Sequence, residues 1–159
     1  MLVQAPVRVA ALGYAVPGTV IAIGVMLPLA WLDGHIDLLA EQWFGVRTGL
    51  IFSGTLFALL LAYSVRFLAV SLHSVEAGLE RIKPGMDNAA RSLGYAPLKV
   101  LQKVHVPLLR ASVLTALLLV FVDVLKELPA TLILRPFNFN TLAVRTYELA
   151  SDERLADAA

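Results

Sequence analysis

The chain has 159 residues, of which 58% are hydrophobic and 16% charged, its formal net charge is +1, and its mean hydropathy is +0.77. This composition is more apolar than that of an ordinary soluble domain, and the small net charge, with basic residues spread along the chain, argues against nucleic acid as a partner. Because the chain has no cysteine, a disulfide, a thiolate nucleophile and a cysteine-ligated metal are excluded.

Three apolar stretches approach the length of about 20 residues that a helix needs to cross about 30 Å of hydrocarbon. They cover residues 7–32, 50–72 and 111–134. The first follows Arg8 but is longer than the apolar region of a secretory signal and ends without a small-x-small cleavage site, so we expect a helix of the mature protein. The sequence therefore predicts an all-α, polytopic transmembrane helical bundle, with one membrane domain over 1–159.

The charges between these stretches predict the orientation of the helices, because cytoplasmic loops collect Lys and Arg. Segment 73–110 carries six basic residues against three acidic ones, whereas segment 33–49 carries one against three. We expect 73–110 to be cytoplasmic, and both 33–49 and the polar segment 135–159 to lie outside. In this orientation Arg66 lies near the inner surface.

Small residues recur in the second stretch at intervals of four, at Gly54, Ala58 and Ala62. Such a stripe lets transmembrane helices approach closely. Arg66 continues it, with a side chain long enough to reach the inner surface. We expect helix packing here, and a gating role is the alternative.

The cytoplasmic segment is patterned as short helices separated by breaks. Pro84 fits a break, Asp87 or Asn88 can cap a short helix over 89–93, and Gly94 suits the left-handed residue that ends it. We expect a second short helix from residue 97 to about 104 before the chain enters the third span.

A spaced motif runs through this segment. Asn88-Ala89-Ala90 is followed after three residues by Gly94, and after nine more by Val104-His105-Val106-Pro107. The motif resembles the cytoplasmic signature of the permeases of ABC importers, which reads Glu-Ala-Ala, three residues, Gly, nine residues, Ile-x-Leu-Pro. Val104 and Val106 are conservative replacements, whereas Asn88 stands where the family has Glu. Pro107 is acceptable in a first helical turn, where its missing N–H has no partner.

The resemblance implies that the short helix is a coupling helix seated in a groove of a separate ATPase subunit. Small residues that allow close approach, a sharp turn and an apolar anchor suit a helix-in-groove contact. The alternative is an amphipathic helix lying on lipid headgroups. The residues that the resemblance assigns to ATPase coupling are Asp87, Asn88, Ala89, Ala90, Leu93, Gly94, Val104 and Pro107.

The third stretch carries charged residues inside an apolar run, which are functional candidates because charge is costly in a bilayer. Asp123, Lys126 and Glu127 are spaced to share one helical face, and Lys126 can pair with either neighbour. Pro129 can bend the helix one turn later. These residues are candidates for the translocation path, and a structural ion pair inside the bundle is the equal alternative.

A finer resemblance, to the iron(III) permease group, extends over nearly the whole chain. It rests on residues 14–20, 121–131, 135–143 and 147–151. Thiamine, sulfate, molybdate and polyamine permeases share this architecture. Members of the group have further spans before and after the region seen here, so the resemblance implies an incomplete type I ABC importer permease.

The resemblance implies a bacterial inner-membrane protein embedded in lipid, with cytoplasmic ABC ATPase subunits and an external substrate-binding protein as partners. No enzyme motif is present, and no cofactor or metal site is expected, since the three His residues lack ligand spacing. Two other functions stay open: an ion-gradient carrier that uses Asp123 or Glu127, and a non-transport membrane protein whose basic loop recruits another cytosolic partner.

Overall fold

The computed structural model describes residues 13–154, and within this range every regular element is a helix. The all-α prediction is confirmed. In chain order the elements are α2 (Gly18–Phe44), α3 (Leu56–Leu79), α4 (Pro84–Ser92), α5 (Pro97–Val100), the π-helical turn η1 (Leu101–His105), α6 (Val106–Lys126), α7 (Pro129–Leu134) and α8 (Leu142–Ser151).

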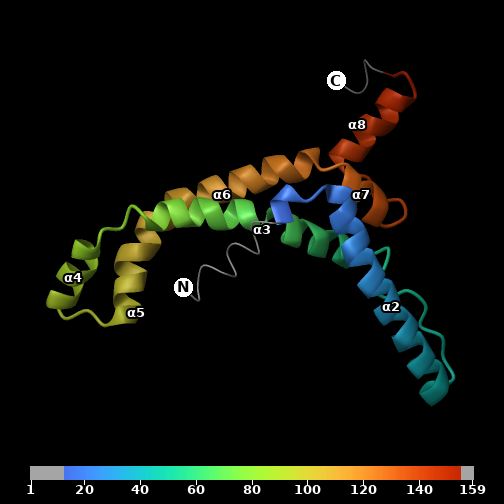
Figure 1. Ribbon diagram of the computed structural model, residues 1–159, viewed down its shortest axis with the longest axis horizontal. Helices are drawn as coiled ribbons and strands as arrows, with labels where there is room; N and C mark the ends of the chain where they lie inside the picture. The colour runs from blue at the N-terminus through green and yellow to red at the C-terminus, as the bar shows by residue number, and fades with distance from the viewer. Residues whose placement is uncertain (1–12, 155–159) are drawn as a thin grey trace.

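Within residues 13–154, three helical runs are long and apolar enough to cross a membrane: Gly18–Phe44, Leu56–Leu79 and Pro97–Lys126. Figure 1 shows α3 and α6 side by side as a long pair, with α2 diverging from them. Helices α4 and α5 lie at one end of this pair, whereas α7 and α8 lie near the other.

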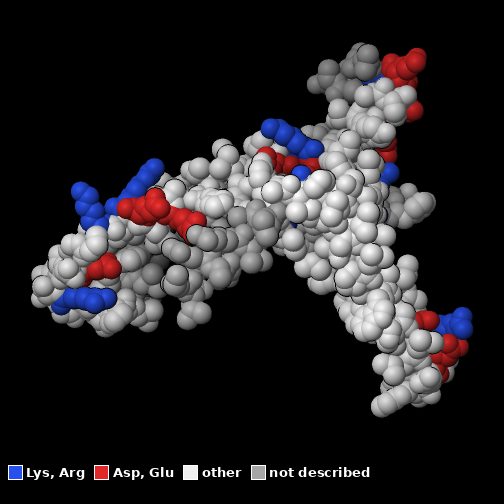
Figure 2. All heavy atoms as spheres, in the orientation of Figure 1, with Lys and Arg blue, Asp and Glu red and all other residues white. Residues whose placement is uncertain are grey.

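The core forms where α2, α3 and α7 meet, and it is built largely from small and aliphatic side chains. Its buried members are Ile21, Ala22, Leu29, Ala58, Leu59, Ala62, Ala130 and Leu134. Most of the α6 surface, by contrast, is exposed apolar side chain. Figure 2 shows charged side chains gathered near the α4–α5 end, at the tip of α2 and around the α6–α7 junction, with uncharged surface between them. A lipid environment or further helices suit this surface.

Helix α2 starts at Gly18 and ends beyond the predicted first span. Residues 7–12 of that span, including Arg8, lie outside the described residues. At the other end the helix continues beyond residue 32 to Phe44, so most of the segment expected as an outer loop is helical.

The acidic residues of this segment explain the continuation, because Asp33, Asp37 and Glu41 are four residues apart and share one face of α2. The Asp33 carboxylate accepts backbone N–H bonds from residues 51–53 at 2.8 to 3.2 Å. Asp37 accepts bonds from the N–H groups of Thr48 and Gly49 at 2.7 and 2.9 Å. These carboxylates fasten the returning chain onto α2.

Helix α3 begins later than the predicted second span, and this changes the small-residue stripe. Gly54 lies ahead of the helix with a φ of 69°, so it supports the turn into α3 and lies off the helical face. Ala58 and Ala62 are in the helix and are fully buried in the core. The stripe starts at Ala58 because Thr55, with an extended backbone, is the N-cap of α3.

The third predicted span is broken before its end. Helix α6 ends at Lys126, Glu127 has an extended backbone with φ −74° and ψ 101°, and α7 starts at Pro129. Pro129 therefore occupies the first turn of a new helix, where its missing N–H costs nothing. The break precedes the proline, where the sequence suggested only a bend.

Candidate functional site

The segment predicted to couple to an ATPase, residues 87–107, is organised around α4, which begins at Pro84 with Lys83 as its N-cap. Neither Asp87 nor Asn88 caps the helix, so this part of the prediction is wrong. Pro84 starts the helix earlier because its fixed φ suits the first helical position. Asp87 instead lies in the first turn of α4.

The C-terminal end of α4 turns sharply at Gly94. Its φ is +80°, which confirms the predicted left-handed conformation. The N–H of Gly94 donates to the carbonyl of Arg91 at 2.9 Å, and the N–H of Tyr95 donates to that of Ala90 at 3.2 Å. These bonds satisfy carbonyls at the helix end and set the direction of the chain into α5.

The two sides of α4 differ in exposure. Ala90 is buried on the side that packs against α5 and η1. Asn88 and Ala89 are exposed, and Leu93 at the end of the helix is 76% exposed. The outer side of α4 thus combines small residues with one apolar anchor, as a groove-bound helix requires.

The helix expected after Gly94 is not separate from the third span. Helix α5 passes directly into η1 and then α6, which gives one helical run over Pro97–Lys126. Val104 is half-buried in η1, and Pro107 is in the first turn of α6. A proline ring clashes with the carbonyl four residues before it, here that of Lys103, and we attribute the wider π turn to relief of that clash.

One side-chain hydrogen bond joins α4 to this run in the described part of the chain. His105 Nε2 and Asp87 Oδ1 are 2.7 Å apart, and the two side chains are only partly exposed. Among the described residues this is the one hydrogen-bonded side-chain pair between α4 and the run from α5 to α6.

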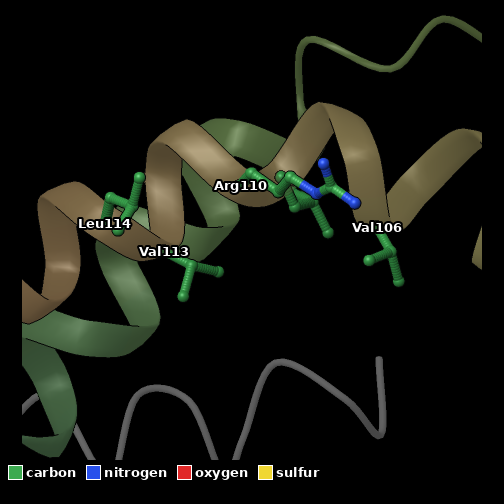
Figure 3. Close-up of a pocket in the computed structure, with 5 residues that line it drawn as sticks. Val106, Arg110, Val113 and Leu114 are labelled. Carbon is green, nitrogen blue, oxygen red and sulfur yellow. The ribbon is translucent and has the colours of Figure 1, made fainter.

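The N-terminal half of α6 presents an apolar hollow of about 470 Å³. Figure 3 shows Val106, Arg110, Val113 and Leu114 along the same part of the helix. The lining is almost wholly apolar apart from Arg110, whose aliphatic stem can lie against such a surface while its guanidinium reaches polar surroundings. This face of α6 is left uncovered by the described residues.

A second polar site lies within the helical bundle, where Arg66 of α3 pairs with Glu127. Arg66 Nε is 2.9 Å from Glu127 Oε2, and the Glu127 side chain is only 6% exposed. Arg66 Nη1 also donates to the carbonyl of Val16 at 2.9 Å, and Glu127 Oε1 accepts the N–H of Ala130 at 3.1 Å. The pair thus connects α3, the segment before α2 and the start of α7.

Two hydroxyl groups extend this site. Thr131 Oγ1 donates to the Glu127 carbonyl at 2.6 Å, and the hydroxyls of Tyr63 and Thr131 are 2.5 Å apart. Thr131 is fully buried. These hydrogen bonds satisfy backbone groups near the α6–α7 break, among them the Glu127 carbonyl and the Ala130 N–H, that lack partners within a helix.

The predicted stripe of Asp123, Lys126 and Glu127 is therefore divided. Asp123 is half-buried and Lys126 exposed, and neither makes an ion pair within the described range. Because α6 ends at Lys126, Glu127 leaves the helical face and meets Arg66 instead. No group of three or more His, Asp or Glu residues suited to a metal ion occurs in residues 13–154.

Comparison with known proteins decides the family. Residues 5–148 match the family model described as binding-protein-dependent transport system inner membrane component. The chain belongs to this family. It is accordingly an integral inner-membrane protein, a permease-type chain of an ABC importer, in agreement with its three apolar helical runs.

Curated relatives of this permease chain have different named substrates. The Fe(3+)-transport system permease protein FbpB 2 of Haemophilus influenzae is 28% identical over 145 residues, which is 91% of this chain and 26% of the relative. The putative 2-aminoethylphosphonate transport system permease protein PhnV of Salmonella typhimurium is 30% identical, again over 91% of this chain, and 49% of that relative is covered. The chain thus spans between a quarter and a half of their lengths.

No local pattern in the sequence predicts the pairing of Arg66 with Glu127 directly. Arg66 lies midway along α3 and contacts the α6–α7 break, and its expected place near the inner surface stays a prediction. One indirect signal is available. Arg66 continues a stripe of small residues and Glu127 lies in another apolar run, and charged residues in apolar runs favour pairing with each other.

Proposed function

We propose that this chain is part of the transmembrane permease subunit of an ATP-driven ABC importer, which forms the translocation path and couples to a separate ATPase through residues 88–107. The observation that carries the proposal is the geometry of α4: a short helix with an exposed Leu93, ended by the left-handed Gly94. This shape and the signature spacing occur together between two long apolar helices.

Coupling follows from the way α4 is attached. In the proposed mechanism, ATP binding closes two ATPase subunits and displaces the coupling helix seated on them. The run Pro97–Lys126 starts next to α4 and continues across the membrane without a break, so it can carry the displacement to the bundle. The helices then alternate between inward-open and outward-open arrangements, while an external binding protein delivers the substrate.

The polar residues at the outer end of α6 have separable roles in this proposal. Glu127 is committed to Arg66 and to the start of α7, so we assign it to holding the broken span together beside the path. Asp123 and Lys126, which are unpaired within the described residues, are the candidates for facing the path itself. Pro129 fixes the point where the second helical piece begins.

For the substrate we propose iron(III), on the basis of the resemblance to iron permeases and the relative named for Fe(3+) transport. A relative named for 2-aminoethylphosphonate transport has slightly higher identity, so that phosphonate is the second candidate. Uptake of radiolabelled iron and of the phosphonate by cells with and without the intact gene separates them. Iron uptake that depends on the gene supports the proposal, and phosphonate uptake alone overturns it.

Cysteine protection tests the docking surface. A cysteine at Ser92, beside the exposed Leu93, should react with a membrane-impermeant maleimide in inside-out vesicles and be shielded when the ATPase subunit is bound. A cysteine at Val46, in the loop after α2, should react only in right-side-out vesicles and be insensitive to the ATPase. Unchanged labelling at position 92 with bound ATPase would exclude docking there. Uptake driven by an ion gradient without any ATPase would favour the carrier alternative.

A further inference from the structure

The coupling helix α4 is held to the chain by two short linkers, residues 80–83 and 93–96. Both are turns with few hydrogen bonds to anything beyond their own neighbours. These bonds set the direction of the chain around α4, but none of them reaches α6 to fix the angle between the nine-residue helix and that span. A helix that must pass a displacement to α6 needs a further contact that fixes this angle.

Asp87 and His105 supply such a contact. They are 18 residues apart in the sequence, and they come from different elements, the first turn of α4 and the last residue of η1. A carboxylate in a first helical turn is already favoured by the helix dipole. Its bond to His105 directs it to the base of α6 and away from the exposed side with Asn88 and Ala89.

The position of His105 adds to the argument. It ends a π-helical turn directly before α6, and π turns inside helices occur frequently at functional sites. The turn rotates the following residues relative to a regular α-helix. Because the signature places Val104 and Pro107 on either side, the π turn and His105 lie where the coupling segment becomes the membrane span.

We propose that Asp87 and His105 form a positioning pair that fixes the angle between α4 and α6, so that movement of α4 on the ATPase is passed to the span without slack. The inference rests on the proposed function and deepens it. Asp87 then acts within the permease and does not substitute for the carboxylate that the signature has at position 88. Contact with the ATPase belongs to Asn88, Ala89 and Leu93 on the exposed side.

The test uses the complete permease with its ATPase in proteoliposomes. A reporter cysteine replaces Leu125 near the outer end of α6, and its reaction rate with an impermeant maleimide is measured with and without ATP and vanadate. In the permease that carries only the reporter cysteine, the maleimide reaction rate should change when ATP and vanadate are added. With His105→Ala, ATPase copurification should stay the same while the change shrinks about two- to fivefold, the range expected for losing a partly exposed pair.

Two further variants keep the interpretation specific. The exchange Asp87→His with His105→Asp should restore the native change, because the contact is re-formed with the partners reversed. Lys103→Ala removes a basic side chain from the same π turn without touching Asp87, and should leave the change intact. A full response in His105→Ala, or an exchange variant as impaired as the single variant, would overturn the positioning pair. Failure of the native permease to bind ATPase would instead overturn the proposed function.

Discussion

Two polar pairs of the molecule, Arg66–Glu127 and Asp87–His105, differ mainly in burial. Arg66–Glu127 lies inside the bundle and joins three segments around a helix break, whereas Asp87–His105 is partly exposed and joins a surface helix to the base of a span. Removing one partner of a buried pair leaves an uncompensated charge, while a partly exposed pair is replaced by water. The first pair therefore supports the fold, and the second, in our proposal, sets the angle between α4 and α6.

The largest effect should follow from Glu127→Ala in the complete permease. The variant leaves the largely enclosed guanidinium of Arg66 without its buried partner and removes the acceptor for the Ala130 N–H, so stability should fall by about 3 kcal/mol or more. Thermal unfolding in detergent measures the loss. The double variant Arg66→Met with Glu127→Gln removes the charge imbalance and should recover much of it; equal losses in both variants would argue against a mutual pair.

A smaller loss of stability is expected from a substitution at Gly18, the first residue of α2, and Gly85 in the first turn of α4 is the matched control. A Cβ at Gly18 would collide with Glu127 Oε1 and lie 3.2 Å from Arg66 Nη1, whereas one at Gly85 meets nothing within 4 Å. Gly18→Ala should therefore destabilise the permease by about 1–3 kcal/mol. Gly85→Ala should be neutral or slightly stabilising. Equal unfolding temperatures for the two variants would contradict the close approach at Gly18.

The contact between the Tyr63 and Thr131 hydroxyls, beside the Arg66–Glu127 pair, should contribute still less to stability. Tyr63→Phe removes the bond between the Tyr63 and Thr131 hydroxyls but leaves the Thr131 bond to the Glu127 carbonyl. The expected loss is about 1 kcal/mol, measured in the same unfolding assay. A loss as large as that of Glu127→Ala would mean that Tyr63 contributes more to the site than one hydrogen bond.

The coupling segment was the easier of the two regions to predict from sequence. Gly94, the prolines and the signature spacing act through local backbone preferences, and the left-handed turn at Gly94 is confirmed. The start of α4 was misplaced because a proline can either end one helix or begin the next. The pairing of Asp87 with His105 could not be read locally, since it depends on how α4 packs back on η1.

The membrane region shows the limit of local patterns. The apolar runs and the all-α class follow from composition, but the partner of Glu127 depends on a long-range contact with Arg66 and on a break that removes Glu127 from the α6 face. Likewise, Asp33, Asp37 and Glu41 suggested an exposed loop by charge. Their spacing of four was the signal for a helix whose acidic face holds the returning chain.

Copurification of the ATPase with Gly94 variants tests the central claim most directly. Gly94→Val places a β-branched residue in a left-handed conformation, which costs about 1–2 kcal/mol. The variant should therefore reduce copurification of the ATPase about five- to thirtyfold. Its insertion into the membrane should be unchanged. Gly94→Asn, which tolerates that conformation, should stay near the native level. Native ATPase binding by Gly94→Val would contradict the assignment of residues 88–107 as the docking segment.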